Sequence, residues 1–261
     1  MNRDFAVIIG GTSYIAGQVL PFLNLNVKTT YFISRNLKLE TYPRISGLSK
    51  VVKISKYNAD QINKIISETN LTQSSSVLMI NFAGTLGNLI ESGITNVSEF
   101  YETFHSNLDP FLHSINFFSQ AGPNSLYITF SGAGVGGDSL DDSSSGYLCA
   151  KTSMAVLVET LQEKFKSQDK HICSIAPGPF PSQMQKSLLD TRLVHKISNL
   201  RIKAAEKVVA NGSSTKKLIS VLNLAISKPE NFGGRIISAN FDAFETVEMN
   251  EKFGKLRRVS D

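Results

Sequence analysis

Tyr147 and Lys151 stand four residues apart in the sequence, and Ser131 precedes them at the end of an apolar run. On a helix, residues four apart lie on one face, one turn from each other. An ammonium group in that position favours the charged form of a neighbouring phenol and lowers its pKa, which makes tyrosine a usable proton donor and acceptor. The spacing therefore predicts that Tyr147 exchanges a proton with a substrate and that Lys151 assists it.

The elements that position these side chains belong to a chain of 261 residues, which is long enough to bury one sizeable core. The composition, 41% hydrophobic and 19% charged, argues against disorder. Short apolar runs rich in Val, Ile and Phe are near-continuous rather than alternating, which is typical of parallel strands covered on both faces. The expected strands are 5–9, 29–34, 50–54, 77–81, 125–131, 171–176 and 235–239.

Helical segments are expected between these strands. They are 15–25, 60–69, 97–120, 146–166 and several turns within 183–227. Strands that alternate with helices in this way predict an α/β fold: one doubly wound, parallel, seven-stranded sheet with helices on both faces. We expect a single domain over 1–261, in which 1–130 mainly binds a nucleotide and 131–261 mainly carries catalysis and substrate binding.

A glycine-containing turn follows the first expected strand and leads into a helix. Such a turn directs backbone N–H groups and the helix N-terminus at a bound phosphate, although a plain tight turn is the alternative. Ala16 and Gly17 are small enough for close packing of the helix on the sheet. The candidate cofactor contacts in this turn are Gly10, Thr12, Ser13, Tyr14 and Ile15.

The second expected strand ends at Ser34, which is followed by Arg35. An NAD site usually has a carboxylate here for the ribose 2′-hydroxyl, whereas arginine suits a 2′-phosphate. A neutral serine and a cationic arginine allow a charge-assisted pair with phosphate. These two residues therefore favour NADP(H) over NAD(H).

Six segments in order resemble the short-chain dehydrogenase/reductase family, and the resemblance covers essentially the whole chain. The matching segments are Gly10–Gly17, Asn81-Phe82-Ala83-Gly84, Asn107-Leu108, Ser131-Gly132-Ala133-Gly134, Tyr147-x-x-x-Lys151 and Ile175–Met184, which contains Pro177-Gly178. The resemblance implies a Rossmann-like fold and an NAD(P)-dependent oxidoreductase. It also implies that Asn81, Ala83, Gly84, Pro177 and Gly178 lie against the cofactor.

The family's four catalytic positions carry over to Asn107, Ser131, Tyr147 and Lys151. The resemblance implies that Tyr147 exchanges the proton and that Lys151 lowers its pKa and holds the nicotinamide ribose, so that both also contact the cofactor. Ser131 would hydrogen-bond the carbonyl or hydroxyl of the substrate, and Asn107 would seat a proton-relaying water. Hydride transfer of this kind needs no metal, and no metal-ligand cluster stands out in the sequence.

The expected partner is a small-molecule carbonyl/alcohol substrate. A net charge of +5 and the basic segment 186–217 admit an anionic sugar or acyl-type metabolite. Nucleic acid is not expected, because aromatic residues are not interleaved with these charges. No stretch approaches the length of about 20 apolar residues that spans a bilayer, so we expect no membrane partner and a cytoplasmic location. The resemblance implies a homodimer or homotetramer, with the apolar helix 97–120 at the interface.

Two other functions remain open on the sequence. One is a sugar epimerase or dehydratase that keeps its nucleotide bound, although such relatives usually carry a larger C-terminal substrate region. The other is a non-catalytic NAD(P)-binding sensor or scaffold, which would not need the four catalytic positions. Fold does not decide among these functions.

Overall fold

A computed structural model describes residues 3–34, 48–55, 58–87, 96–132, 142–190, 199–242 and 244. Within these residues, seven strands form one sheet in the order β3-β2-β1-β4-β5-β6-β7, and all neighbours run parallel. The strands are β1 (Arg3–Ile9), β2 (Val27–Ser34), β3 (Leu48–Lys53), β4 (Val77–Asn81), β5 (Ser125–Phe130), β6 (Lys170–Ala176) and β7 (Ile236–Ser238). The predicted seven-stranded parallel sheet is confirmed.

The strand order reverses between β1 and β4. After β3 the chain crosses back and places β4 on the other side of β1, so that Ile9 at the end of β1 lies between Ile33 and Asn81. In open sheets of this kind, ligands bind beyond the carboxyl ends of the strands at the point where the order reverses. The topology therefore predicts a ligand site at the residues that follow β1 and β4.

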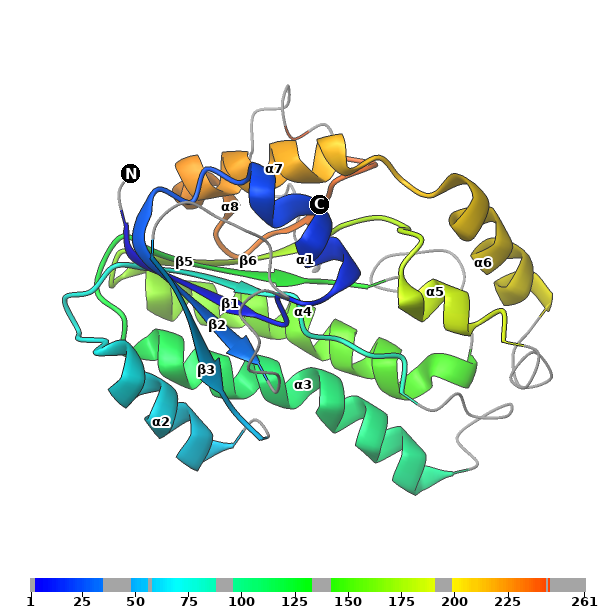
Figure 1. Cartoon of the computed structure of the whole chain (residues 1–261), viewed down its shortest axis with the longest axis horizontal. Helices are drawn as coiled ribbons and strands as arrows, with labels where there is room; N and C mark the ends of the chain where they lie inside the picture. Colours follow the sequence, from blue (N-terminus) through cyan, green and yellow to red (C-terminus); the bar gives the residue numbers. More distant parts are fainter. Residues whose placement is uncertain are drawn as a thin grey trace, which may run out of the picture.

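Helices cover both faces of the sheet (Figure 1). One face carries α1 (Tyr14–Val19), α7 (Thr215–Ser227) and α8 (Pro229–Phe232), and the other carries α2 (Ala59–Thr69), α3 (Val97–Ser119) and α4 (Ser145–Lys166). Successive side chains of a strand point to opposite faces. Accordingly, Ala6 and Ile8 join the core under α7, whereas Val7 and Ile9 join the core under α3. Because both faces are buried, the strands need apolar residues at nearly every position.

Helix α1 is shorter than the predicted segment 15–25. It begins at Tyr14 because the Ser13 side chain caps it, accepting a hydrogen bond from the Ala16 N–H at 3.2 Å. The chain then tightens into a 3₁₀ turn over Leu20–Phe22. Pro21 has no N–H to donate to an α-helical bond, which ends the helix at this place.

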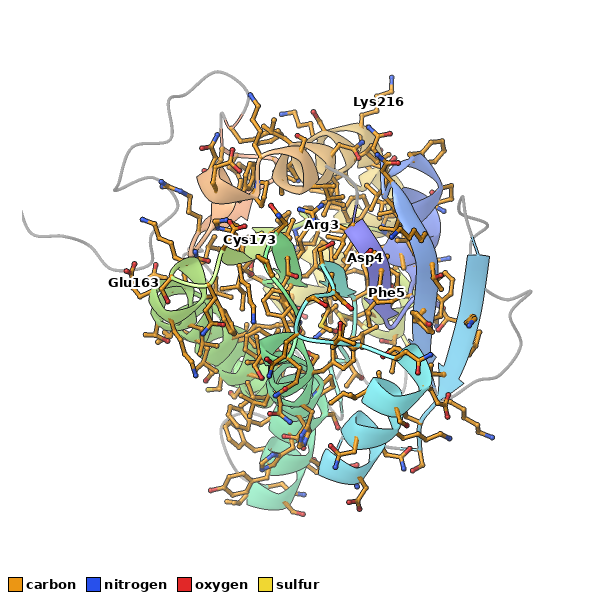
Figure 2. The ribbon with its side chains drawn as sticks, turned by 90° about the vertical axis from the view of Figure 1, so that its left-hand side faces the viewer. Arg3, Asp4, Phe5, Glu163, Cys173 and Lys216 are labelled. Carbon is orange, nitrogen blue, oxygen red and sulfur yellow. The ribbon has the colours of Figure 1, made fainter. Side chains whose placement is uncertain are left out.

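The amino-terminal ends of the strands are tied together by a buried arginine. Arg3 opens β1 and is 1% exposed. Its Nε donates to the Asn124 carbonyl at 2.9 Å and its Nη1 to the Ile226 carbonyl at 3.2 Å. Figure 2 looks onto this side of the molecule, where Arg3 and Asp4 are labelled. The first strand is thereby bound to the turn before β5 and to the end of α7.

Two short helices lie beyond the carboxyl ends of the central strands, α5 (Gln183–Ser187) and α6 (Asn199–Asn211) (Figure 1). They contribute to a small apolar cluster that is separate from the two faces of the sheet and that we call the cap cluster. Its buried members are Leu86, Tyr147, Leu188 and Ala205, with Leu148, Met184, Leu189 and Ile202 packed against them. Among the described helices, none is long and apolar enough to cross a bilayer.

Candidate active site

The turn between β1 and α1 packs closely against the segment that follows β4. Gly10 has φ +69°, and a Cβ placed on it would lie 2.8 Å from the Ala83 nitrogen and 3.0 Å from the Phe82 carbonyl carbon. The Phe82 N–H also donates to the Ile9 carbonyl at 2.8 Å. Only glycine combines this backbone conformation with this approach. The turn and the 82–84 segment therefore form one surface at the reversal point of the sheet.

The remaining turn residues face this edge to different extents. Thr12 is exposed, Ser13 is partly buried as the cap of α1, and Tyr14 is 40% exposed. Ile15 packs against the apolar core under α7. Ala16 is fully buried, as expected, but a Cβ at Gly17 would meet nothing within 4 Å. The expected close helix–sheet packing therefore holds for Ala16 and is wrong for Gly17, which lies on the outer face of α1.

The end of β2 lies at the same edge. Ser34 is its last residue and pairs in register with Lys53 at the end of β3. The side chain of Lys53 is exposed. Arg35, the residue that favours a 2′-phosphate, lies outside the described residues. Sequence reasoning overlooked Lys53, because only the strand register brings it beside Ser34.

Asn81 is held by a buried hydrogen-bond network. Its Oδ1 accepts from the Ala83 N–H at 2.9 Å, and its Nδ2 donates to the Tyr127 hydroxyl at 3.1 Å. The Tyr127 hydroxyl in turn lies 2.6 Å from the Ser114 Oγ on α3. Burial raises the pKa of Tyr127, so that its hydroxyl stays protonated. The network fixes the segment after β4, where Ala83 packs against the turn at Gly10.

This network predicts an unequal effect of removing two tyrosine hydroxyls from the same face of the sheet. Tyr127→Phe leaves the Asn81 amide without its acceptor and should lower the free energy of unfolding by about 1 to 3 kcal/mol. Tyr31→Phe is the control, because its hydroxyl makes only a 3.4 Å contact to the Thr69 carbonyl. Urea unfolding of both variants measures the difference. Equal losses would contradict the role given to the network.

Asn107 clamps the loop that follows β4. Its Oδ1 accepts from the Thr85 N–H at 2.9 Å, while its Nδ2 donates to the carbonyls of Thr85 and Thr103, both at 2.8 Å. A Cβ added to Gly84 would lie 3.4 Å from the Asn107 Oδ1 and 3.5 Å from the Lys151 Nζ. Asn107, Gly84 and Lys151 thus converge. The side-chain amide is committed to backbone partners, which makes Asn107 a positioning residue for this loop.

Beyond the end of β5, Tyr147 lies against Gly132, the residue that follows Ser131. Ser131 is 4% exposed, and its Oγ has no hydrogen-bond partner among the described residues. A Cβ on the next residue, Gly132, would overlap the Tyr147 hydroxyl and lie 2.9 Å from the ring atoms Cε1 and Cζ. The phenol therefore sits directly over Gly132. A buried hydroxyl that lacks a protein partner is suited to hydrogen-bond a ligand atom.

Lys151 lies one turn after Tyr147 on α4 and is buried. Its Nζ donates to the Phe130 carbonyl at 3.1 Å and lies 5.8 Å from the centroid of the Tyr147 ring. Burial lowers the pKa of Lys151 to about 8. The ammonium therefore links α4 to the end of β5 and remains predominantly charged at neutral pH.

The expected lowering of the tyrosine pKa is not what the structure shows. Burial raises the pKa of Tyr147 to about 12, and the charge of Arg201 opposes that rise. Desolvation disfavours the phenolate more strongly than the nearby charge favours it. The phenol is consequently a proton donor at neutral pH. Sequence reasoning did not single out Arg201, which comes from α6 and lies 54 positions from Tyr147 (201 − 147).

Pro177 and Gly178 follow β6 at the same edge of the sheet. Gly178 has φ +90°, and a Cβ on it would overlap the Asn240 amide and lie 3.1 Å from the Ser213 Oγ. The Asn240 Nδ2 donates to the Ser213 Oγ at 2.8 Å, and the Ser213 N–H donates to the Pro179 carbonyl at 2.8 Å. The turn therefore packs against Ser213, which follows α6, and against Asn240, which follows β7.

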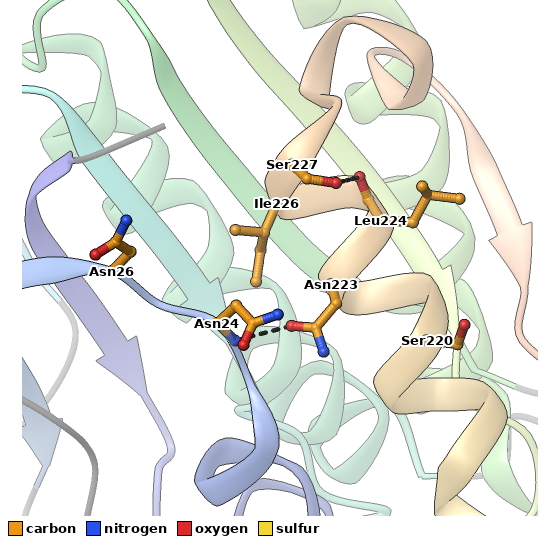
Figure 3. A pocket seen from close by; sticks show the side chains of 7 residues that line it. All are labelled: Asn24, Asn26, Ser220, Asn223, Leu224, Ile226 and Ser227. Atoms are coloured by element: carbon orange, nitrogen blue, oxygen red, sulfur yellow. Dashed lines mark hydrogen bonds between the residues drawn. The ribbon is translucent and has the colours of Figure 1, made fainter.

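A cavity of about 550 Å³ lies elsewhere, and its lining is mostly uncharged and polar. It is bounded by Asn24 and Asn26, which precede β2, and by residues of α7 such as Asn223 (Figure 3). The Asn223 Oδ1 already accepts from the Asn24 N–H at 2.9 Å. This cavity is at the amino-terminal side of the sheet, away from the convergence of Ser131, Tyr147 and Lys151.

Comparison of the sequence finds no matching protein-family model and no matching curated protein. Comparison of the structure finds solved proteins of the same fold. A short-chain dehydrogenase/reductase from Saccharomyces cerevisiae superposes with a TM-score of 0.74 at 14% identity, over 93% of this chain and 98% of that one. A short chain dehydrogenase family protein from Francisella tularensis gives 0.70 at 14%, over 90% and 96%.

A third solved structure is a complex of Pseudomonas aeruginosa RhlG with NADP at its active site. It superposes with a TM-score of 0.69 at 13% identity, over 91% of this chain and 95% of that one. All three likenesses extend over nearly the full length of both chains. From its strand order and these superpositions, the chain has the fold of the short-chain dehydrogenases/reductases.

Proposed function

We propose that this protein is an NADP(H)-dependent oxidoreductase that interconverts a ketone or aldehyde and an alcohol, with Tyr147 as the acid/base group. The observation that carries the proposal is the placement of the Tyr147 hydroxyl over Gly132, which directly follows Ser131, a residue whose buried hydroxyl has no hydrogen-bond partner within the described part of the chain. On this proposal both O–H groups bond the same carbonyl oxygen. One of them, a phenol with its pKa raised to about 12, holds the proton that the oxygen needs.

The residues present fit a nicotinamide dinucleotide. The positive-φ turn at Gly10 packs against Ala83 and leads into the N-terminus of α1, where a pyrophosphate would lie beside Thr12, Ser13, Tyr14 and Ile15 and next to Ala83 and Gly84. When bound, the nicotinamide would supply the hydride. Lys151, near Gly84, would hold the ribose, and the turn at Pro177 and Gly178 would line the nicotinamide. On this proposal, 1–130 mainly binds the nucleotide and 131–261 mainly binds and orients the substrate.

The preference for NADP(H) is supported by two cations, one that follows Ser34 in the sequence and one that pairs with Ser34 in the sheet. Arg35 follows Ser34 in the sequence, and the exposed Lys53 pairs with Ser34 across β2 and β3. A 2′-phosphate near Ser34 would therefore meet positive charge, and β2 itself, Val27–Ser34, contains no Asp or Glu. Phosphate held by cationic donors forms hydrogen bonds about twice as strong as neutral ones.

Calorimetric titration with NADPH and NADH in parallel tests this proposal. We expect micromolar binding of NADPH (on the order of −8 kcal/mol) and much weaker binding of NADH. Arg35→Asp and Lys53→Glu should each reduce the preference, whereas Lys216→Glu, an exposed lysine on α7, should leave it unchanged. Absence of binding by either nucleotide would refute the proposal. Binding without turnover on a panel of ketones and aldehydes would favour the sensor function instead.

The buried ammonium predicts a distinctive pH profile for carbonyl reduction. Tyr147 stays protonated up to about pH 12, so the group that titrates first is Lys151, with its pKa of about 8. Its charge is present below that pH and is lost above it. We therefore expect kcat/KM for reduction to be level below pH ~7.5 and to fall about tenfold per pH unit above ~8.

The control for this profile is Lys151→Arg, whose guanidinium keeps its charge throughout the range. Its residual activity should lack the inflection near pH 8. Steady-state rates at saturating NADPH measure both profiles. An inflection that persists in Lys151→Arg would contradict the assignment to Lys151.

We also propose that the protein forms a homo-oligomer through α3 and α4. Tyr101 and Leu112 on α3, and Val156 on α4, are 55%, 42% and 44% exposed. Apolar surface on adjoining helices is stabilised when a second copy covers it. Light scattering of Leu112→Glu against the wild type tests the proposal, and an unchanged mass would refute it.

A further inference from the structure

The side chain of Thr103, on α3, contacts two segments that lead to Tyr147. Thr103 is buried, with 4% of its surface exposed. A Cβ placed on Gly87 would overlap the Thr103 Oγ1 and lie 2.7 Å from its Cγ2. A Cβ placed on Gly146 would lie 3.1 Å from the Thr103 Cβ. One small side chain therefore packs against both the loop after β4 and the start of α4.

The start of α4 also packs directly on the backbone of α3. A Cβ on Gly146 would lie 2.7 Å from the Phe100 carbonyl oxygen and 3.4 Å from the Phe104 nitrogen. Gly146 is buried and immediately precedes Tyr147 in the sequence. The contact between α3 and α4 at this point therefore determines where the backbone of Tyr147 lies.

The loop after β4 contacts the same tyrosine through a different residue. Leu86 packs with Tyr147 in the cap cluster. Asn107 holds the backbone of Thr85, and its Nδ2 also donates to the Thr103 carbonyl at 2.8 Å. The loop is thus fixed to α3 by the carbonyl of Thr103 as well as by its side chain.

We infer that Thr103 is a positioning residue for Tyr147, and that the shape of its side chain sets the place of the phenol over Gly132. This inference rests on the proposed oxidoreductase function. It adds to the proposed site a residue on α3 that acts through the tyrosine rather than on the substrate. The same side chain holds the loop that carries Leu86 at a fixed distance from the start of α4.

Two physical arguments support this role. A β-branched side chain has few rotamers on a helix, so Thr103 presents a nearly fixed shape. Its neighbours Gly87 and Gly146 have no side chains, so its contacts pass directly to backbone. Removal of Oγ1 and Cγ2 would leave a space into which either segment can shift. A misplacement of about 1 Å in a reacting group can lower a rate about 10²-fold.

The test compares substitutions that change or keep this shape. With a carbonyl compound that the wild type reduces, Thr103→Ala should lower kcat by about 10- to 100-fold. Thr103→Val keeps the branched shape and should keep kcat close to the wild-type value. Calorimetry should show the same NADPH affinity in all variants, because the turn at Gly10 is not altered. If Thr103→Ala does not fold, Thr103→Ser, which removes only Cγ2, takes its place.

Thr69→Ala is the matched control for a loss of stability. Thr69 is also a buried threonine of a helix, 1% exposed at the end of α2, where its Oγ1 donates to the Ile65 carbonyl at 2.8 Å. The substitution removes the same atoms as Thr103→Ala, at a place that has no contact with α4 or with the loop after β4. It should lower the free energy of unfolding and leave kcat unchanged.

Hydrogen exchange of the whole protein gives a second measurement that needs no turnover. Amides that lose their packing exchange faster through local opening. Thr103→Ala should therefore speed exchange in 85–87 and in 149–151, whereas Thr103→Val should leave both segments as in the wild type. Thr69→Ala should speed exchange in α2 and not in these two segments.

Three outcomes would overturn the inference. They are wild-type kcat in Thr103→Ala, a loss in Thr103→Val as large as in Thr103→Ala, and an equal loss in the Thr69→Ala control. Failure of the proposed function is distinguishable, because the wild type itself would then oxidise NADPH with no carbonyl compound. In that event hydrogen exchange decides alone, and unchanged exchange in 85–87 and 149–151 of Thr103→Ala would overturn the role given to Thr103.

Discussion

Tyr147→Phe is expected to lower kcat for carbonyl reduction by about 10²- to 10⁴-fold, the range that a general acid contributes. The phenyl ring keeps its place in the cap cluster beside Leu86 and Leu188, so the fold and the wall of the site should persist. Only the hydroxyl over Gly132 is removed. On the proposed function that oxygen is the proton donor, so the reaction would lose its acid while the substrate would keep its hydrogen bond to Ser131.

The measurement is NADPH oxidation under single-turnover conditions, together with calorimetry of NADPH binding. Binding should be unchanged, since the hydroxyl is not needed for the Gly10 turn. Tyr101→Phe is the matched control, because Tyr101 is 55% exposed on α3 and takes no part in the site. A Tyr147→Phe variant with more than a few per cent of wild-type kcat would eliminate Tyr147 as the acid.

Gly10→Ala is expected to be the most damaging substitution in the nucleotide turn. Its φ of +69° is costly for any residue with a Cβ, and that Cβ would lie 2.8 Å from the backbone nitrogen of Ala83. Both partners are backbone, so neither can move aside as a side chain would. We expect the free energy of unfolding to fall by about 2 to 5 kcal/mol, from left-handed strain and overpacking together.

NADPH binding should weaken as well, because the turn must shift away from Ala83. Each lost hydrogen bond to a charged phosphate costs about 1.5 to 3 kcal/mol, a factor of roughly ten or more in affinity. Gly17→Ala is the control, seven positions later, where a Cβ meets open space within α1. It should stabilise the fold by about 0.5 to 1 kcal/mol. Denaturant unfolding and calorimetry measure the free energy of unfolding and the NADPH affinity of both variants. Similar losses of stability and affinity in the two variants would show that the clash at Ala83 is not the cause.

The strands could be predicted because their physical signal is local. A parallel strand covered on both faces needs apolar residues at nearly every position, and Val77–Asn81 and the run beginning at Ser125 show this directly. Helix ends were harder to predict. The segment 15–25 contains Pro21, whose missing N–H converts the end of α1 into a 3₁₀ turn.

Only those site residues could be predicted whose relative position follows from their spacing along the sequence. Tyr147 and Lys151 are one turn apart in any helix, and the structure places them together with Ser131, Gly132 and Asn107. The direction of the Tyr147 pKa was predicted wrongly, because spacing says nothing of burial, and burial outweighs the charge. The positions of Arg201 and Lys53 relative to the site likewise could not be predicted, because tertiary structure and strand register determine them.

The packing of Gly178 against Ser213 and Asn240 affects the order in which parts of the site can form during synthesis. The Pro177–Gly178 turn rests on Ser213 and Asn240, and Asn240 lies beyond the last strand of the sheet. A growing chain can therefore assemble β1 and α4, which position Gly10 and Tyr147, while the Pro177–Gly178 turn still lacks the residues it packs against. On the proposed function, NADPH would therefore bind after Asn240 has been synthesised and packed behind Gly178, rather than act as a template on which the earlier strands fold.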